Sequence, residues 1–195
     1  MKTMTDRLRT IVAALGMAAI VACGGGGAPL TVNVDGNERT LDITSSGTYT
    51  STKTFTQTRD GGSTITKAAS HYIVVGNYEI DTSSGMLSMN KPLTEAGQMR
   101  FAIQIVGRED TDDKSPIVPG TYTTAADKYD KLDYANLTVF DGGKETRTSI
   151  NISKAEGEVK ITSVTDETVS GEIDLKEGDK TIKGGFTAKI IKRKS

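Results

Sequence analysis

Residues 157–190, GEVKITSVTDETVSGEIDLKEGDKTIKGGFTAKI, decide the fold. Apolar side chains recur at every second position in three runs of this stretch, residues 159–161, 169–175 and 182–190, and turn-forming residues separate the runs. A two-residue period is that of a β-strand that buries one face. We therefore predict three strands that follow one another in an antiparallel meander.

The same alternation recurs along the rest of the chain. Further strands are predicted at residues 30–34, 39–43, 72–75, 78–80, 99–106, 137–139 and 150–152, with hairpin turns at 35–37, 76–77 and 141–144. Residues 48–58 alternate too, but they carry few large apolar groups, which is typical of an edge strand or an exposed hairpin arm. No helix of three turns is predicted, and a single helical turn is expected at residues 125–132.

The predicted strands belong to one all-β domain, residues 30–195. The longest irregular stretch is expected at residues 107–119, and neither half of the chain beside it has an apolar pattern rich enough for a core of its own. Strands with one buried face pack in two layers, so we predict a single antiparallel β-sandwich, with a closed antiparallel β-barrel as the alternative. Gly171 and Gly184 interrupt predicted strands and indicate bulges or close backbone approach.

The first residues have the layout of a secretory signal. Lys2, Arg7 and Arg9 precede an apolar run at residues 11–22. Twelve helical residues rise roughly 18 Å, which is too short for a hydrocarbon core of about 30 Å. We therefore expect residues 1–22 to be a signal peptide that is removed.

The end of this segment, Ile20-Val21-Ala22-Cys23, resembles the lipobox of bacterial lipoproteins. The resemblance implies cleavage before Cys23, attachment of diacylglycerol to its sulfur and acylation of the new amino terminus, which together give stable membrane attachment in the cell envelope. Glycine occupies positions 24–27, so residues 23–29 are expected to be a flexible tether. Because residue 24 is not Asp, the enteric sorting rule implies the outer membrane.

The carboxyl half resembles a second group, the uncharacterised secreted β-lipoproteins of Bacteroidota and related Gram-negative bacteria. The resemblance rests on Pro119-Gly120-Thr121-Tyr122, residues 157–163, Val169-Ser170-Gly171 and Gly184-Gly185-Phe186. These are turn and strand residues. The resemblance therefore implies a β-fold and carries over no catalytic or ligand-binding residue.

Charge and cysteine content narrow the possible functions. Without residues 1–22 the chain loses three of its 24 basic and one of its 25 acidic residues, which leaves a net charge of −3. This balance argues against nucleic acid as a partner. Cys23 is the only cysteine, so its lipidation would leave no disulfide and no thiol for catalysis or metal binding.

Few residues are candidates for a site. Tyr122, Tyr129 and Tyr134 are close together in the sequence, and we predict them as a candidate aromatic platform for a sugar or a peptide. His71 is the only histidine, and its place on an alternating strand predicts a surface or rim position.

Two further groups favour ordinary structural roles. Residues 108–114 hold four carboxylates but lack the spacing of a calcium-binding EF-hand loop, so a solvated loop is predicted. Met86, Met89 and Met99 carry the soft thioethers that copper(I) prefers, but core filling is the expected role. We expect no metal site and no cofactor.

These features predict a non-catalytic binding or accessory module of the cell envelope, with a glycan or an envelope protein as candidate ligands. Two alternatives stay open. One is a structural or assembly subunit of an envelope complex. The other is a glycosidase that uses only carboxylates, whose two acids would come from distant strands.

Replacing Cys23 with Ala tests the predicted anchor. We expect the change to abolish metabolic labelling of the protein with palmitate, because acylation follows lipid attachment to this sulfur. Ala22→Gly is the control, since it keeps a small residue before the cysteine and should retain the label. Persistent labelling of the Cys23→Ala protein would show that the predicted lipidation is wrong.

Overall fold

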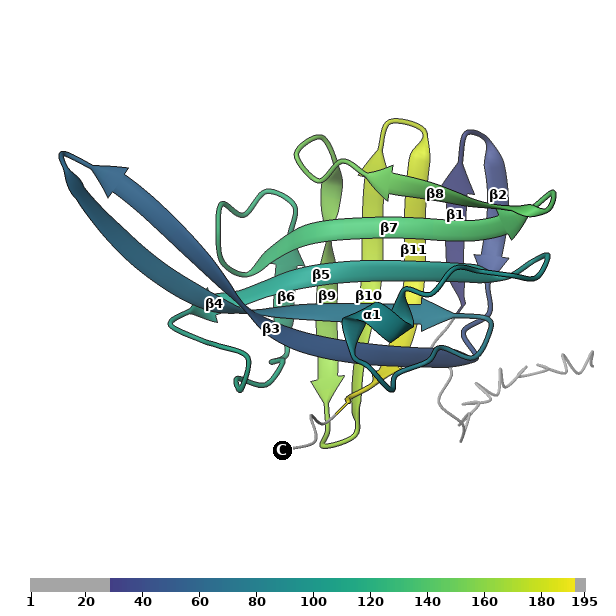
Figure 1. Ribbon diagram of the computed structural model, residues 1–195. Coiled ribbons are helices and arrows are strands. Elements are labelled where there is room, and N and C mark those ends of the chain that lie inside the picture. Colours follow the sequence, from purple (N-terminus) through teal and green to yellow (C-terminus); the bar gives the residue numbers. More distant parts are fainter. Residues whose placement is uncertain (1–28, 192–195) are drawn as a thin grey trace, which may run out of the picture.

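The structure, a computed structural model, describes residues 29–191 and is built almost entirely of β-strands (Figure 1). The predicted signal peptide, Cys23 and the glycine run lie outside the described residues. Within residues 29–191, no helix has both the length and the apolar character needed to cross a membrane.

Eleven strands and one short helix make up the described part of the chain. They are β1 (Leu30–Val34), β2 (Asn37–Leu41), β3 (Ser45–Arg59), β4 (Gly62–Gly76), α1 (Met86–Met89), β5 (Met99–Glu109), β6 (Gly120–Thr123), β7 (Lys131–Asp141), β8 (Lys144–Ile150), β9 (Glu156–Val164), β10 (Thr168–Glu177) and β11 (Lys180–Lys189). The single four-residue helix agrees with the prediction that no helix of three turns forms.

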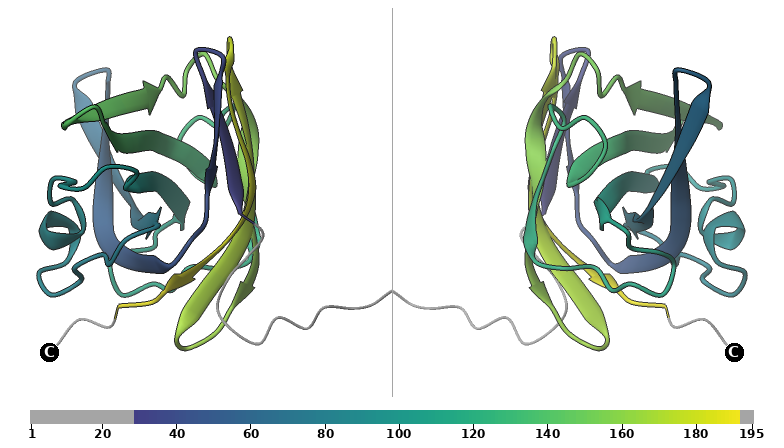
Figure 2. Two further views of the ribbon diagram at one scale, coloured as in Figure 1. Left: turned by 90° about the vertical axis from the view of Figure 1, so that its right-hand side faces the viewer. Right: turned by 90° about the vertical axis from the view of Figure 1, so that its left-hand side faces the viewer.

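The strands form two layers. One layer has the order β2-β1-β11-β10-β9-β6, and the other has the order β3-β4-β5-β7-β8. Thr123 of β6 and Lys131 of β7 join the layers through a parallel pair, so the sheet is mixed rather than purely antiparallel. The second layer runs across the first in Figure 1, and Figure 2 shows the two layers face to face. This arrangement is the predicted β-sandwich.

The alternative of a closed barrel is wrong. The strand order ends at β2 and β3, and these strands are not paired with each other in the described residues, although only residues 42–44 separate them in the chain. β3 approaches β11 at one point, where the backbone N–H of Lys189 donates to the Ser46 hydroxyl at 3.1 Å. The sheet is therefore curled but open.

The predicted meander is confirmed in β9, β10 and β11. Val159, Ile173 and Ile182 point inward and are buried in the main core. The opposite layer contributes Ile103 of β5 and Leu137 of β7 to the same core. One buried face per strand therefore holds the two layers together, as the two-residue period indicates.

Both strand glycines mark irregular or close backbone approaches, as predicted. The register of β9 and β10 shifts between Ser170 and Gly171. Gly184 has a φ of 139°, and a Cβ there would lie 2.4 Å from the carbonyl oxygen of Pro29 and 3.0 Å from the Cα of Leu30. β1 can lie this close to β11 only because residue 184 has no side chain.

β3 and β4 form a long hairpin that reaches beyond the body of the sandwich (Figure 1). The 15 residues of β3 all pair with β4, up to the turn at Asp60-Gly61. β4 pairs with β5 only as far as Ala68. Beyond this residue β3 and β4 pair with each other alone, so residues 53–67 form a two-stranded arm. β3 is thus an edge strand whose outer part is an exposed hairpin arm, and both alternatives predicted for residues 48–58 are confirmed.

The hairpin predicted at residues 72–80 is wrong. β4 continues to Gly76, and the chain then leaves the sheet for residues 77–98, which include α1. This segment covers the outer face of the second layer with an apolar cluster, whose buried members are Tyr72, Val74, Ile80, Met89 and Ala102. The last nine residues of β4 are all buried, so this strand has no alternating pattern.

Three further boundaries differ from the prediction. β8 ends at Ile150, and Ile152 lies in a turn. No helical turn forms at residues 125–132. The longest segment between strands of residues 29–191 is 77–98 rather than 107–119, because the strand predicted at residues 78–80 does not form.

Arg100 fastens segment 77–98 to the sheet. It is only 5% exposed on the outer face of β5. One guanidinium nitrogen donates to the carbonyl oxygens of Lys91 at 2.6 Å and Met89 at 3.3 Å, and to the Tyr78 hydroxyl at 3.1 Å. Hydrogen bonds from a buried cation are stronger than neutral ones, so these contacts hold the segment against the strand.

Gly184→Ala tests the close approach of β1 and β11. The added methyl group would overlap the Pro29 carbonyl, and the backbone conformation is unfavourable for alanine, so we expect the free energy of unfolding to fall by about 2–4 kcal/mol. Gly62→Ala is the control, because its Cβ would meet nothing closer than 3.7 Å. Urea unfolding of both variants measures the difference, and equal losses would contradict the close approach.

Candidate functional site

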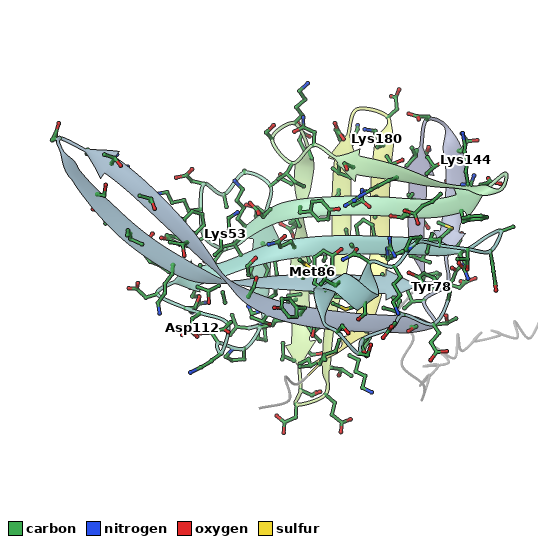
Figure 3. All side chains as sticks on the ribbon, viewed as in Figure 1. Lys53, Tyr78, Met86, Asp112, Lys144 and Lys180 are labelled. Carbon is green, nitrogen blue, oxygen red and sulfur yellow. The ribbon has the colours of Figure 1, made fainter. Side chains whose placement is uncertain are left out.

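A cleft of about 380 Å³ lies between two hairpins that face each other across the sandwich. One is the β1–β2 hairpin of the first layer, and the other is the β7–β8 hairpin of the second; Lys144 marks the second hairpin in Figure 3. The cleft is lined by Val32, Val34, Asp35, Asn37 and Arg39 from the first hairpin and by Leu137, Val139, Asp141, Gly142, Lys144, Thr146 and Thr148 from the second.

The cleft exists because the outer strand of each hairpin turns polar side chains inward. Cross-strand partners share a face, and the register places Arg39 beside Val32 and Thr148 beside Leu137. In both β2 and β8, the only buried residue is the last one, at the deep end of the hairpin. The apolar core therefore ends at β1 and β7, and the space between β2 and β8 is open to solvent.

The walls of the cleft change from apolar at the floor to charged at the mouth. Val32, Leu137 and Val139 form the floor and are all buried. Thr146 and Thr148 add hydroxyl groups on the β8 wall. The exposed rim carries two cations and two anions, Arg39, Lys144, Asp35 and Asp141. Such a gradient suits a molecule with an apolar body and a polar end.

An ion pair closes part of the mouth. Arg39 of β2 donates to the Asp141 carboxylate of β7 at 2.8 Å and so links the two layers. This hydrogen bond and the positive charge of Arg39 lower the pKa of Asp141. The two side chains are 41% and 64% exposed, so water and salt screen the pair and it holds the mouth only weakly. A ligand could displace this contact at little cost.

Two larger hollows are weaker candidates. One of about 660 Å³ is bordered by segment 77–98, and one of about 680 Å³ lies over β9–β11. Polar and charged side chains, such as Asp81 and Lys91, line most of the first hollow. The second hollow is lined by only two large apolar side chains, Ile173 and Phe186, whereas the cleft is lined by four, Val32, Val34, Leu137 and Val139. Small-molecule sites usually rest on apolar side chains, which favours the cleft between the hairpins.

The structure does not bring the predicted tyrosine platform together. Tyr122 of β6 is buried in the main core, and its hydroxyl donates to a backbone carbonyl at 3.0 Å. Tyr129 precedes β7, and its ring meets the Phe55 ring edge-on with 5.5 Å between centroids. Tyr134 packs near Tyr72 on the outer face of the second layer. The three tyrosines thus lie in three different places, and none lines the cleft.

His71 is buried, whereas the sequence predicts a surface or rim position. It is 1% exposed on the inward face of β4, and its Nδ1 lies 3.0 Å from the Thr50 hydroxyl oxygen. It borders a cavity of about 190 Å³ that Val118 and Tyr122 also line. Burial lowers the pKa of His71 to about 4, so the ring is neutral at pH 7. The prediction fails because both faces of β4 are covered at this point.

Residues 108–114 include a loop that is closed by its own hydrogen bonds. The Asp112 carboxylate accepts from the backbone N–H of Lys114 at 3.0 Å, which lowers the pKa of Asp112. The Thr111 hydroxyl oxygen accepts from the backbone N–H of Ala69 at 2.8 Å and ties the loop to β4. Within residues 29–191, no three His, Cys, Asp or Glu side chains gather in a way that could hold a metal ion.

The three methionines occupy different environments. Met89 is buried in the outer cluster and Met99 in the main core, which confirms core filling for both. Met86 is 43% exposed in α1, so the same prediction is wrong for this residue. Residues 86–89 form a helix that lies on the sheet, and only the fourth residue of this helix reaches the apolar cluster.

The chain matches no known protein family, no curated protein and no solved structure. The cleft is therefore identified from its geometry alone. One feature of the sequence indicates the cleft. Lys144, Thr146 and Thr148 occupy alternate positions and are polar, whereas the inward positions of a strand that packs on the core are apolar. The sequence does not show that Arg39 and Asp141, 102 residues apart, meet at one mouth.

Lowering the pH is expected to destabilise the fold through His71. The unfolded chain takes up a proton near the ordinary pKa of 6.5, whereas the folded ring stays neutral until about pH 4. Stability from this group is therefore complete above pH 6.5 and falls as the pH drops from 6.5 to 4, by up to about 3 kcal/mol.

Urea unfolding at successive pH values measures this loss. His71→Gln should flatten the profile, because glutamine does not titrate. Carboxyl groups with a lowered pKa, such as Asp141, lose their contribution below their ordinary value of 3.8 and so act outside this window. Parallel profiles for the two proteins between pH 6.5 and 4 would show that His71 is not the cause.

Proposed function

We propose that this chain is a non-catalytic, lipid-anchored protein of the outer membrane that binds a small amphipathic molecule in the cleft between its β1–β2 and β7–β8 hairpins. The lipobox that ends at Cys23 and the glycines after it support the location. The apolar floor that opens to solvent between the two hairpins supports the binding role, and it is the observation that carries the proposal.

The lining of the cleft indicates the class of ligand. The floor of Val32, Leu137 and Val139 offers apolar contact, while Thr146 and Thr148 offer hydroxyl groups to a hydroxyl or carbonyl group. The volume of about 380 Å³ falls in the range of small-molecule sites, roughly 300–1,000 Å³. A short acyl chain with a polar head group at the rim meets these conditions.

The residues that line the cleft include no aromatic ring to stack on a sugar, which favours an amphipathic molecule over a glycan.

The titratable groups support binding rather than catalysis. A carboxylic acid that protonates a leaving group needs a raised pKa. In the described residues, the four carboxyl groups whose pKa values shift, those of Asp81, Asp112, Asp141 and Glu177, all shift downward. His71 lines a separate cavity and is neutral at pH 7. Both observations favour a binding protein over a carboxylate-dependent glycosidase.

The position of the cleft favours a ligand from the aqueous side. β1 begins at Leu30, beside the proposed tether, and ends at the turn whose Asp35 stands on the rim of the cleft. Five extended residues span roughly 15 Å. The mouth thus lies at the end of β1 that is remote from the anchor. We expect the ligand, or a partner that delivers it, to approach from the compartment that faces away from the anchoring membrane.

A structural or assembly subunit of an envelope complex is the second candidate. The arm of residues 53–67 favours it, because a two-stranded ribbon that reaches beyond the body offers an open strand edge to another chain. The arm and the cleft use different residues, so the two roles are compatible.

A fluorescent fatty acid, dansyl-undecanoic acid, tests the cleft. The protein is the full chain with Cys23→Ala, which carries no lipid of its own. We expect saturable binding to this protein and about tenfold or more weaker binding after the further change Thr148→Phe. Thr148 is a half-buried wall residue, so a phenyl ring at this position fills the space that the acyl chain would occupy.

Thr40→Phe is the matched control. Thr40 follows Arg39 on β2 but is exposed and points away from the cleft, so the same substitution leaves the cleft open. Its binding of the probe should equal that of the parent protein, and thermal unfolding checks that both variants are folded. Equal binding by both variants would exclude the cleft as the site, and a parent protein that does not bind the probe would contradict the ligand class.

A further inference from the structure

The outer edge of the arm carries backbone groups that have no strand partner. β3 pairs with β4 alone along its whole length. From Lys53, which Figure 3 places near the base of the arm, to Arg59 at the tip, no other strand of residues 29–191 pairs with this edge. The N–H and C=O groups that point outward are therefore open to an added strand.

This edge lacks the features that usually protect an exposed strand. Residues 54–58, Thr-Phe-Thr-Gln-Thr, contain no charge and no proline. Their register with β4 runs without a bulge. Threonine and phenylalanine also favour the extended backbone of a strand. A regular and neutral edge of this kind accepts a further strand readily.

The sequence of the edge is complementary to itself. Threonine occupies every second position from residue 48 to residue 58. An antiparallel pair of two copies with Phe55 opposite Phe55 places Thr54 of each copy opposite Thr56 of the other. Threonine then faces threonine along one side of the paired strands, and the two aromatic rings meet on the other side. Both kinds of cross-strand pair stabilise antiparallel sheets.

The charges agree with this register. Lys53 of one copy lies opposite Gln57 of the other, so no two cations lie directly opposite each other; Lys53 and Arg59 of the other copy are diagonal neighbours on one face. Arg59 at the tip lies opposite Ser51 at the base of the arm. The pairing therefore uses the whole free edge and stops where the body of the second copy begins.

Phe55 is already held in place for such a contact. Its ring meets the Tyr129 ring edge-on at 5.5 Å between centroids, and the Lys53 ammonium lies 5.4 Å from the centroid of the Phe55 ring. Lys53 is itself fixed by an ion pair with Asp133 at 2.6 Å. A side chain that is ordered before association loses less conformational entropy when a partner packs against it.

We propose that two copies of this chain associate through β3, antiparallel about Phe55, so that their second layers form one continuous sheet. The interface is the same surface on both copies, as a two-fold axis requires. The bodies lie at opposite ends of the paired arms, because β3 runs from body to tip. Two lipid anchors on one assembly strengthen membrane attachment through avidity. This inference does not depend on the ligand of the cleft.

The oligomeric state of the full chain with Cys23→Ala tests the pairing. Sedimentation velocity at rising protein concentration is expected to show a monomer–dimer equilibrium. Adding Thr54→Glu and Thr56→Glu sets like charges opposite each other across the two-fold axis, and we expect only monomer. Within one copy Thr54 faces Lys67 of β4, so a carboxylate at position 54 is tolerated by the arm itself.

Ser63→Glu with Ile65→Glu is the matched control. Both residues are exposed on β4, on the same face of the arm and with the same spacing, so the charge change is equal while the β3 edge is untouched. This control should dimerise like the parent protein. Circular dichroism verifies the β-content of each variant, and amide hydrogen exchange of residues 53–59 should slow as the dimer forms.

Three outcomes would overturn the proposal. The first is a parent protein that stays monomeric at every concentration. The second is a dimer that survives Thr54→Glu with Thr56→Glu. The third is dissociation of the Ser63→Glu, Ile65→Glu control alone, which would assign the contact to β4, through its face or its own unpaired outer edge, rather than to the edge of β3.

Discussion

Packing of inward-facing apolar side chains between the two layers is the constraint on which the rest of the structure depends. Cys23 is the only cysteine, so no disulfide can form within residues 29–191, and the main core draws side chains from both layers. Where the inward positions cease to be apolar, the layers part. This happens in β2 and β8, where the cleft opens, and in the outer half of β3, where the hairpin continues as the arm. Both candidate functional regions therefore follow from where the apolar pattern stops.

The sequence predicts those strands that bury one face. β9–β11 alternate clearly, because water on the other side of each strand keeps every second residue polar. β5 is buried on both faces, but Arg100 and Gln104 on its outer face still separate the apolar positions of its inner face. Only residues 72–75 of β4 are predicted as a strand, since segment 77–98 covers its outer face as well and its buried residues do not alternate with exposed ones. The hairpin predicted at residues 72–80 is wrong for the same reason. Ile80 is apolar because it packs on the outer face of the sheet and does not belong to a strand. His71 is also misplaced for this reason.

The candidate site lies beyond what a local pattern can predict. Thr146 and Thr148 appear in the sequence as missing apolar positions of β8, but the opposite wall comes from β2, far earlier in the chain. The predicted tyrosine platform is the opposite case, because residues that are close in the sequence lie apart in the fold. Tyr122 and Tyr134 are near each other in the sequence, yet the corner between the two layers falls between β6 and β7. One ring therefore points into the core, and the other lies on the outer face.

The narrow space at Gly184 has a mechanical consequence. Under the proposed anchoring, tension on the tether enters the domain at Leu30, the first residue of β1. This strand is paired on both sides, with β2 along its whole length and with β11 at Thr31–Asn33. Hydrogen bonds between antiparallel strands run perpendicular to the strands, so a pull along β1 loads them together in shear instead of opening them one after another. Because Gly184 has no side chain, β1 can pair with β11 as well as with β2. The tether is therefore attached to a strand that resists extraction from the sheet under tension.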